Sequence, residues 1–268
     1  MAFNLPEKST MKYLSVFFAI LFHLSVFSQD ERKKAIESGT STLQIVTLKP
    51  NGTNAYKDIF GTVIKNKYFL TCFHTLSNDD DMKYVKMRLL YNRKGSKSDS
   101  LSFYENERDF KQILNNPVYK KNDHSTDYIF IPINKRLKSK NPDFDTSSIA
   151  KNDSLYAMGP FMGSIIPSIF EVLFEDREFE NKGVEFIVIF GLSEPGFSGS
   201  PVFNSKGKIV GMMQFGIENN FQDYFLKKLK AGKITRKKYD DIIKGYKIGM
   251  RANYVIKSKY LLDLIPKK

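Results

Sequence analysis

The chain of 268 residues is long enough to form one large hydrophobic core or two smaller ones. It carries a formal net charge of +13, and its single cysteine excludes an internal disulfide bond, so stability must come from the core. No internal repeat or low-complexity tract is present, which excludes solenoid architectures.

The N-terminal segment has the pattern of an export signal. A basic region begins at Met11-Lys12, and an apolar run follows that ends at Phe27 and is too short for a typical membrane span. We therefore expect a signal peptide at about 11–28, with residues 1–10 as an upstream extension, and a periplasmic or secreted mature protein. No second apolar stretch of membrane length follows, so the mature chain is predicted not to be transmembrane. An uncleaved N-terminal membrane anchor is the alternative.

Short runs rich in Val, Ile, Phe and Tyr alternate with turn residues along the rest of the chain. Such runs predict β-strands and an all-β fold. A short leading helix is expected at 30–38. The expected strands lie at 43–48, 59–64, 68–73, 84–91, 128–133, 154–158, 184–190, 208–214 and 253–256.

His74 lies at the end of the strand predicted over 68–73, which follows a turn at Lys65-Asn66-Lys67. An imidazole titrates near neutral pH, so a histidine in this position suits a general base. A histidine satisfied within the core is the alternative interpretation. Of the other two histidines, His23 lies in the apolar leader and His124 in a polar loop.

Asp127 opens the next strongly apolar strand, Tyr128 to Ile133. A carboxylate buried beside an imidazole would fix its tautomer and stabilise the imidazolium form. Asp123, four residues earlier in a more polar loop, is the alternative partner, and a strand-start cap is the other interpretation of Asp127.

Ser198 stands between Gly196 and Gly199, shortly before Pro201 and an apolar strand-like run. Glycines adopt positive φ and let the backbone approach a substrate closely. Such a turn exposes a hydroxyl and directs N–H groups to one point, as a nucleophile beside an oxyanion hole requires. An ordinary turn serine is the alternative, and Ser200 is a weaker candidate for the nucleophile.

Together, these segments resemble the chymotrypsin-like (trypsin-fold) serine peptidases, especially bacterial secreted and HtrA-like forms. The order His, Asp, Ser is that of the family. The resemblance covers roughly residues 40–265 and rests on three motifs rather than one. The motifs are Leu70-Thr71-Cys72-Phe73-His74, Asp127-Tyr128-Ile129-Phe130-Ile131 and Gly196-Phe197-Ser198-Gly199-Ser200-Pro201.

The resemblance implies two six-stranded antiparallel Greek-key barrels, with a C-terminal helix and a helical-hairpin insertion. The peptidase domain would span 29–268, with the first barrel at about 40–140 and the second at about 150–265. No PDZ-like domain follows, so a monomer is expected rather than an HtrA-type trimer.

The resemblance also implies a mechanism, that of a serine endopeptidase acting on proteins or peptides. Ser198 would attack the peptide carbonyl, His74 would move the proton, and Asp127 would orient His74. Backbone N–H groups of Gly196 and Ser198 would form the oxyanion hole. No cofactor and no metal are expected. Cys72 is expected to be a small buried residue rather than a thiol nucleophile.

Three residues, Leu192, Gln214 and Gly216, are implied to line the specificity pocket. Leu192 stands where trypsin-type pockets carry an aspartate, so an apolar side chain of medium or large size is expected before the cleaved bond. Phe197 stands where animal digestive relatives carry an aspartate next to the nucleophile, so their activation switch is expected to be absent.

The segment 221–247 contains nine Lys or Arg residues and three Asp residues. It predicts two short amphipathic helices, the first ended by Gly232 and the second capped by Thr235. One hypothesis is a lid or exosite for acidic substrates or an anionic surface; the alternative is a solvated basic face. Nucleic acid is not expected as a partner, because no binding module is recognisable. A catalytically silent trypsin-fold binding module that uses this hairpin is the alternative function.

Overall fold

The structure is a computed structural model. It describes residues 29–76, 83–116, 118, 120–122, 126–135, 137, 141–149, 153–160, 167–181, 184–192, 196–217, 221–247 and 250–266. The predicted signal segment, Asp123 and His124 lie outside these residues. Within the described part of the chain, no helix combines the length and the apolar character needed to cross a membrane.

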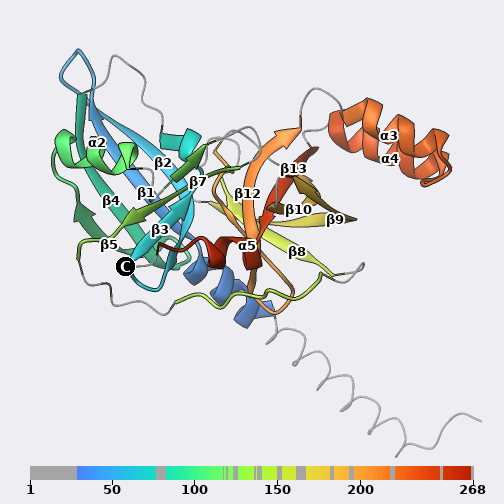
Figure 1. Cartoon of the computed structure of the whole chain (residues 1–268), viewed down its shortest axis with the longest axis horizontal. Coiled ribbons are helices and arrows are strands. Elements are labelled where there is room, and N and C mark those ends of the chain that lie inside the picture. The colour runs from blue at the N-terminus through green and yellow to red at the C-terminus, as the bar shows by residue number, and fades with distance from the viewer. Residues whose placement is uncertain are drawn as a thin grey trace, which may run out of the picture.

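A seven-stranded antiparallel sheet forms the N-terminal unit, in the order β5-β4-β1-β2-β3-β7-β6 (Figure 1). α2 (Glu107–Asn115) covers part of it through Phe110, whose ring stacks on Tyr84 with centroids 4.6 Å apart. The strands are β1 (Ser41–Leu48), β2 (Asn54–Ile64), β3 (Tyr68–Thr71), β4 (Lys83–Lys94), β5 (Lys97–Phe103), β6 (Lys120–Asn122) and β7 (Asp127–Pro132).

The turn between β2 and β3 shows why the local sequence favours this hairpin. Lys65 and Asn66 both have φ of 52°, and the N–H of Lys67 donates to the carbonyl of Ile64 at 3.0 Å. Turns with two residues at positive φ match the twist of paired strands. The turn predicted at 65–67 is therefore confirmed, and it directs β3 toward the predicted active site.

A closed six-stranded barrel forms the C-terminal unit, in the order β10-β13-β12-β11-β8-β9. Its interior is filled by aliphatic side chains such as Leu155, Ile187, Val202 and Val255. The strands are β8 (Leu155–Gly159), β9 (Ser168–Asn181), β10 (Val184–Leu192), β11 (Pro201–Phe203), β12 (Ile209–Ile217) and β13 (Met250–Lys257).

The two units share a buried junction. Leu70 and Phe130 of the first sheet belong to one core cluster with Met212 and Ile256 of the barrel and Leu261 of α5 (Ser258–Asp263). The burial of apolar area on both sides of this junction holds the units in one arrangement. Residues that lie at the facing strand ends are therefore brought together across the junction.

The leading helix over residues 29–39 also joins the two units. Ile36 shares a core cluster with Met158, Phe203 and Ile209 of the barrel side. On the other side, the carboxylate of Glu37 accepts the N–H of Gly95, between β4 and β5, at 3.0 Å. The helix expected at 30–38 is confirmed.

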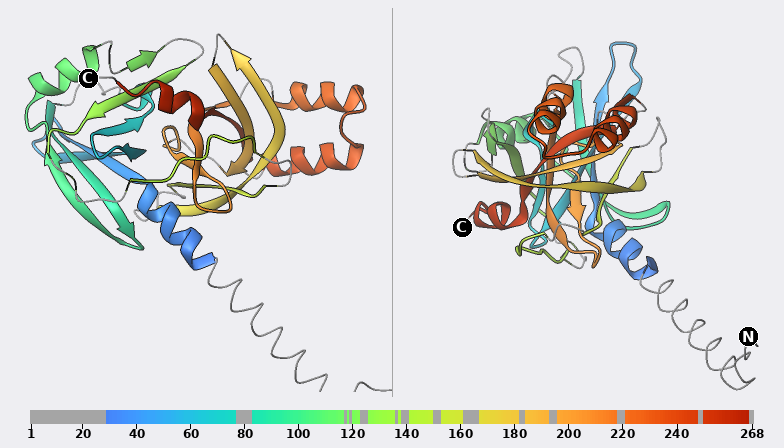
Figure 2. Two further views of the ribbon diagram at one scale, coloured as in Figure 1. Left: turned by 60° about the horizontal axis from the view of Figure 1, so that its bottom comes forward. Right: turned by 90° about the vertical axis from the view of Figure 1, so that its right-hand side faces the viewer.

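A helical hairpin interrupts the barrel between β12 and β13. It consists of α3 (Phe221–Lys230) and α4 (Arg236–Lys247), which lie side by side and project beyond the barrel (Figure 2). Gly232 ends α3 at φ +66°, and the N–H of Lys238 donates to the hydroxyl of Thr235 at 3.2 Å. Both predicted helix caps are confirmed.

The predicted all-β fold of two chymotrypsin-like units, with a C-terminal helix and an inserted helical hairpin, is confirmed. The N-terminal sheet has one strand more than the expected six, the short edge strand β6. Three strands were not predicted: β5, β6 and β9. β5 and the end of β9 are rich in polar residues, and β6 has only three residues, so none of them shows the apolar pattern of a buried strand. The short strand β11 coincides with the apolar strand-like run that follows Ser198.

Candidate active site

His74 and Asp127 are brought together by the pairing of β3 and β7. β3 ends at Thr71, which lies opposite Ile129 of β7, and the one-turn helix η1 (Phe73–Leu76) follows. His74 therefore lies three residues beyond the strand end, rather than at it. Asp127 is the first residue of β7, and its Oδ2 hydrogen-bonds Nδ1 of His74.

The Asp127 carboxylate is fixed by the backbone of η1. Its Oδ1 accepts the N–H groups of Phe73 at 2.9 Å and of His74 at 3.2 Å. Asp127 is 7% exposed, whereas the side chain of His74 is 47% exposed. A carboxylate acceptor at Nδ1 selects the tautomer in which Nδ1 carries the proton, so Nε2 is the basic nitrogen.

The turn that carries Ser198 is held from the side of the second barrel. The N–H of Gly199 donates to the carbonyl of Met213 at 2.8 Å, and the N–H of Met213 donates to the carbonyl of Ser200 at 2.9 Å. Phe197 is buried, and its ring lies 5.4 Å from that of Phe170 between centroids. The side chain before Ser198 is therefore an apolar anchor in the barrel core.

Gly199 brings this turn into contact with the end of β3. Its φ is +89°, and a Cβ on it would lie 2.0 Å from the hydroxyl oxygen of Thr71 and 2.5 Å from the carbonyl oxygen of Phe60. Only a glycine meets both conditions, because other residues are strained at this φ and no space exists for a side chain. The segments of Ser198 and His74 therefore lie against each other.

The predicted oxyanion hole lies on the same turn. Gly196 has φ of +109°, a conformation that glycine adopts without strain. Among the described residues, the backbone carbonyls accept the N–H groups of Gly199 and Ser200 but not those of Gly196 and Ser198. An oxyanion hole formed by Gly196 and Ser198 agrees with this pattern and stays a prediction.

The three residues predicted to line the specificity pocket lie in two places. Leu192 ends β10 opposite Met250, and Gly216 lies on β12 opposite Asn253, so both flank β13. Gln214 is fully buried, and its Oε1 accepts the N–H of Asp127 at 2.9 Å. Its side chain therefore contacts the backbone of Asp127, and the pocket roles of Leu192, Gln214 and Gly216 stay predictions.

Cys72 lies next to the His74–Asp127 pair. It is fully buried, and its Sγ lies 3.2 Å from the carbonyl oxygen of Met213, to which the thiol donates. Burial raises the pKa of this thiol, and the charge of Asp127 raises it further. A protonated, buried thiol is a poor nucleophile.

The structure also reveals a grouping that the sequence spacing did not. Ligand atoms of Cys72, His74 and Asp127 all lie within 4.8 Å of one another. The thiolate is the form that binds metals, and the raised pKa of Cys72 opposes it. The grouping is therefore explained by the His74–Asp127 pair and the thiol packed against it.

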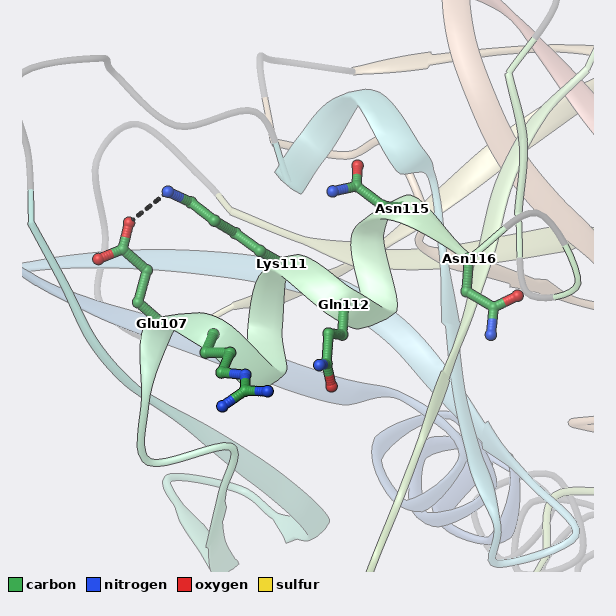
Figure 3. A pocket seen from close by; sticks show the side chains of 6 residues that line it. Glu107, Lys111, Gln112, Asn115 and Asn116 are labelled. Carbon is green, nitrogen blue, oxygen red and sulfur yellow. Dashed lines mark ion pairs between the residues drawn. The ribbon is translucent and has the colours of Figure 1, made fainter.

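A hollow of about 780 Å³ lies along the polar face of α2 (Figure 3). Its lining includes the ion pair between Lys111 and Glu107, at 2.7 Å, and the side-chain amides of Gln112 and Asn116. None of the predicted triad residues lines it. Among the described residues, its lining contains no serine, cysteine or histidine, so this hollow does not pair a nucleophile with a histidine base.

The chain belongs to a known peptidase family. A family model described as the trypsin-like peptidase domain matches residues 60–212, which is more than half of the chain. The match includes all three predicted triad residues. No curated protein sequence shows significant similarity to the chain.

Solved structures share the fold. The chain is similar to the active form of the Rv3671c protease from M. tuberculosis, with a TM-score of 0.53 and 12% identity over 89% of this chain and 84% of that one. It is also similar to the HtrA-type protease AlgW with a decapeptide, with a TM-score of 0.55 and 12% identity over 87% of this chain and 66% of that one. For AlgW with a tripeptide the TM-score is 0.52 and the identity 13%, over 87% and 61%. This chain thus spans less than two thirds of those AlgW chains.

Proposed function

We propose that the protein is an exported serine endopeptidase that hydrolyses peptide bonds with His74, Asp127 and Ser198. One observation carries the proposal. The His74–Asp127 pair lies directly after the end of β3, and the glycine turn of Ser198, from the other unit, packs against Thr71 at that same strand end. Membership of the trypsin-like peptidase family supports the same conclusion. The export signal predicted at about 11–28 supports action outside the cytoplasm.

Ser198 attacks the carbonyl carbon of the scissile bond while Nε2 of His74 takes the hydroxyl proton. The tetrahedral oxyanion is stabilised by the N–H groups of Gly196 and Ser198, each such donor contributing about 10²–10³-fold to the rate. His74 then protonates the leaving amine, and an acyl-enzyme remains on Ser198. Water attacks the acyl-enzyme with His74 as base, which releases the carboxylic acid and restores the serine.

The substrate is a protein or peptide with an apolar side chain before the cleaved bond and acidic residues nearby. Leu192 supports the apolar preference, because it takes the position at which trypsin-type pockets carry an aspartate. The hairpin supports the acidic preference: α3 and α4 connect β12 to β13, and Leu192 and Gly216 both flank β13. The hairpin carries exposed lysines at 227, 230, 233, 237 and 238.

Labelling of the folded full-length protein by a fluorophosphonate probe tests the catalytic proposal. The wild type is expected to label, and Ser198→Ala is expected not to. Ser200→Ala is the matched control, because Ser200 lies two residues away but is fully buried, and this variant is expected to label like the wild type. Repeated failure of folded wild type to label contradicts the proposal and favours the catalytically silent binding module. Labelling that survives Ser198→Ala contradicts the choice of nucleophile.

A further inference from the structure

Two consecutive residues of β12, Met213 and Gln214, lie where the three triad segments meet. Met213 is 2% exposed and Gln214 is fully buried. Their neighbours are the nucleophile turn, the end of β3 and the start of β7. Polar groups in such a place must find partners inside the protein, because an unpaired buried donor or acceptor is costly.

On the nucleophile side, the backbone of Met213 makes two hydrogen bonds with the turn. Its carbonyl accepts from Gly199 at 2.8 Å, and its N–H donates to Ser200 at 2.9 Å. These two bonds join β12 to the two residues that follow Ser198. The position of the nucleophile turn relative to the barrel is therefore set by β12.

On the histidine side, the same carbonyl accepts the thiol hydrogen of Cys72, whose Sγ lies 3.2 Å away. The Nε2 group of Gln214 in turn donates to this sulfur at 3.5 Å. Cys72 precedes His74 by two residues and is fully buried. One carbonyl oxygen thus contacts both the serine turn and the strand that leads to the histidine.

On the aspartate side, Oε1 of Gln214 accepts the N–H of Asp127 at 2.9 Å. Asp127 is the first residue of β7, so this bond holds the backbone from which the triad carboxylate projects. The amide of Gln214 therefore accepts from the aspartate segment and donates to the histidine segment at the same time.

We propose that Gln214, acting through Cys72 and the N–H of Asp127, is a positioning residue that sets the His74–Asp127 pair in register with the Ser198 turn. The inference rests on the proposed peptidase function. An amide suits this place because it both donates and accepts without charge. A carboxylate would add negative charge beside Asp127, and an apolar side chain would leave the N–H of Asp127 buried without its partner.

A positioning role differs from a purely structural one in its effect on His74. If β7 shifts, the charge-assisted hydrogen bond from Nδ1 of His74 to Asp127 weakens, and the proton NMR signal of this ring N–H group moves with it. The titratable groups that face this segment in the described chain are Asp127, Cys72 and Lys120, whose Nζ lies 4.3 Å from the ring centroid of Phe73. Substitution of Gln214 changes none of these charges.

The test compares full-length wild type with Gln214→Met and Gln214→Asn, by peptide hydrolysis and by the proton NMR signal of the Nδ1–H group of His74. Methionine keeps the length but has no amide, and asparagine keeps the amide but is one methylene shorter. For both, kcat is expected to fall about 10–100-fold with little change in KM, because a small misplacement of catalytic groups acts on the chemical step. The Nδ1–H signal of His74 is expected to move from its wild-type position, because the hydrogen bond to Asp127 weakens.

Two further variants sharpen the test. Cys72→Ser keeps a donor for the carbonyl of Met213 and is expected to retain kcat better than Cys72→Ala. Gln112→Met, on the polar face of α2, is the matched control and is expected to match the wild type in both measurements.

A wild-type kcat together with a wild-type Nδ1–H signal of His74 in either folded Gln214 variant would overturn the inference. Loss of the folded state in both variants would also overturn it, in favour of a structural role. If wild type neither labels nor hydrolyses, the proposed function fails separately. The change of the Nδ1–H signal of His74 in the Gln214 variants then decides the positioning role alone.

Discussion

The strand β12 connects a buried region of the molecule to an exposed, positively charged one. Before it ends, it passes the buried junction of the two units, where Cys72, Ser200 and Gln214 are all fully buried. After it ends, the chain enters the basic hairpin of α3 and α4, whose lysines at 227, 230, 233, 237 and 238 are exposed. The junction is fixed by contacts between distant segments, whereas the hairpin is fixed by its own helices and caps.

This difference separates two tasks. Catalytic groups need positions that distant segments determine together, because small displacements lower the rate. A charged hairpin acts on substrate approach through long-range attraction, which tolerates variation in position. The same substitution should therefore have a large effect at the junction and a small effect in the hairpin.

The largest difference is expected for aspartate-to-asparagine substitutions. Asp127→Asn presents an amide to Nδ1 of His74 and favours the wrong tautomer, so kcat is expected to fall about 10⁴-fold. Asp240→Asn removes only an ion pair with Arg236 within α4, at 3.1 Å, and should change kcat by less than about twofold. Steady-state hydrolysis of one peptide by both variants measures the contrast. A loss below tenfold for Asp127→Asn would contradict the assignment of the triad carboxylate.

The second contrast uses two glycines at positive φ. Gly199→Ala combines backbone strain with a Cβ 2.0 Å from Thr71, and it should lower the free energy of unfolding by about 3 kcal/mol or more. Gly232→Ala, at φ +66° with nothing within 4 Å of the added Cβ, should cost only about 1 kcal/mol. Urea denaturation of both variants tests this. Equal losses of unfolding free energy in the two variants would contradict a contribution from the close contacts of Gly199 beyond backbone strain.

A smaller effect is expected from the hairpin charges. Combined substitution Lys233→Glu, Lys237→Glu and Lys238→Glu should raise KM for an acidic peptide about 5–10-fold at low salt, since attraction becomes repulsion. The effect should shrink strongly near 1 M salt, where charges are screened within about 3 Å. Lys94→Glu, an exposed position on β4, is the control. An unchanged KM for the triple variant would support the interpretation of the hairpin as a solvated face.

The smallest effect concerns acid stability at Asp145, in the segment before β8. Hydrogen bonds from the hydroxyl and N–H of Ser147 lower the pKa of this carboxyl, with smaller contributions from Lys208 and Lys206. Because the folded-state pKa is lowered, its stabilisation is present above the unfolded-state value of about 3.9 and is lost as pH falls through the folded-state value.

Asp145→Asn should therefore lower the free energy of unfolding by about 0.5–1 kcal/mol at pH 7. The difference from wild type should disappear in acid, below the lowered folded-state pKa. Thermal unfolding as a function of pH measures this. A difference that grows as the pH falls would contradict the sign of the pKa shift.

Much of the fold could be predicted because the signals are local. Apolar runs marked ten of the strands, the turn at 65–67 marked the hairpin of β2 and β3, and Gly232 and Thr235 marked the helix ends. The strand β9 was missed because its last eight residues read FEDREFEN, without the apolar alternation of a half-buried strand.

The role of Gln214 could not be predicted, because its partners are remote in the chain. It lies 87 residues from Asp127 and 142 residues from Cys72. No local pattern distinguishes a glutamine that lines a pocket from one that bridges two buried segments. The contacts of Gln214 arise only when the two units pack together, so they follow from tertiary structure rather than from motif.

The most direct test of the account is a comparison of peptide hydrolysis by wild type, His74→Ala, Ser198→Ala and the double variant, each as the full chain. If the two side chains act as one unit, each single substitution is expected to lower kcat at least about 10⁴-fold, and the double variant should lose no more. Losses that add in the double variant, or substantial hydrolysis by either single variant, would contradict a shared triad at this junction.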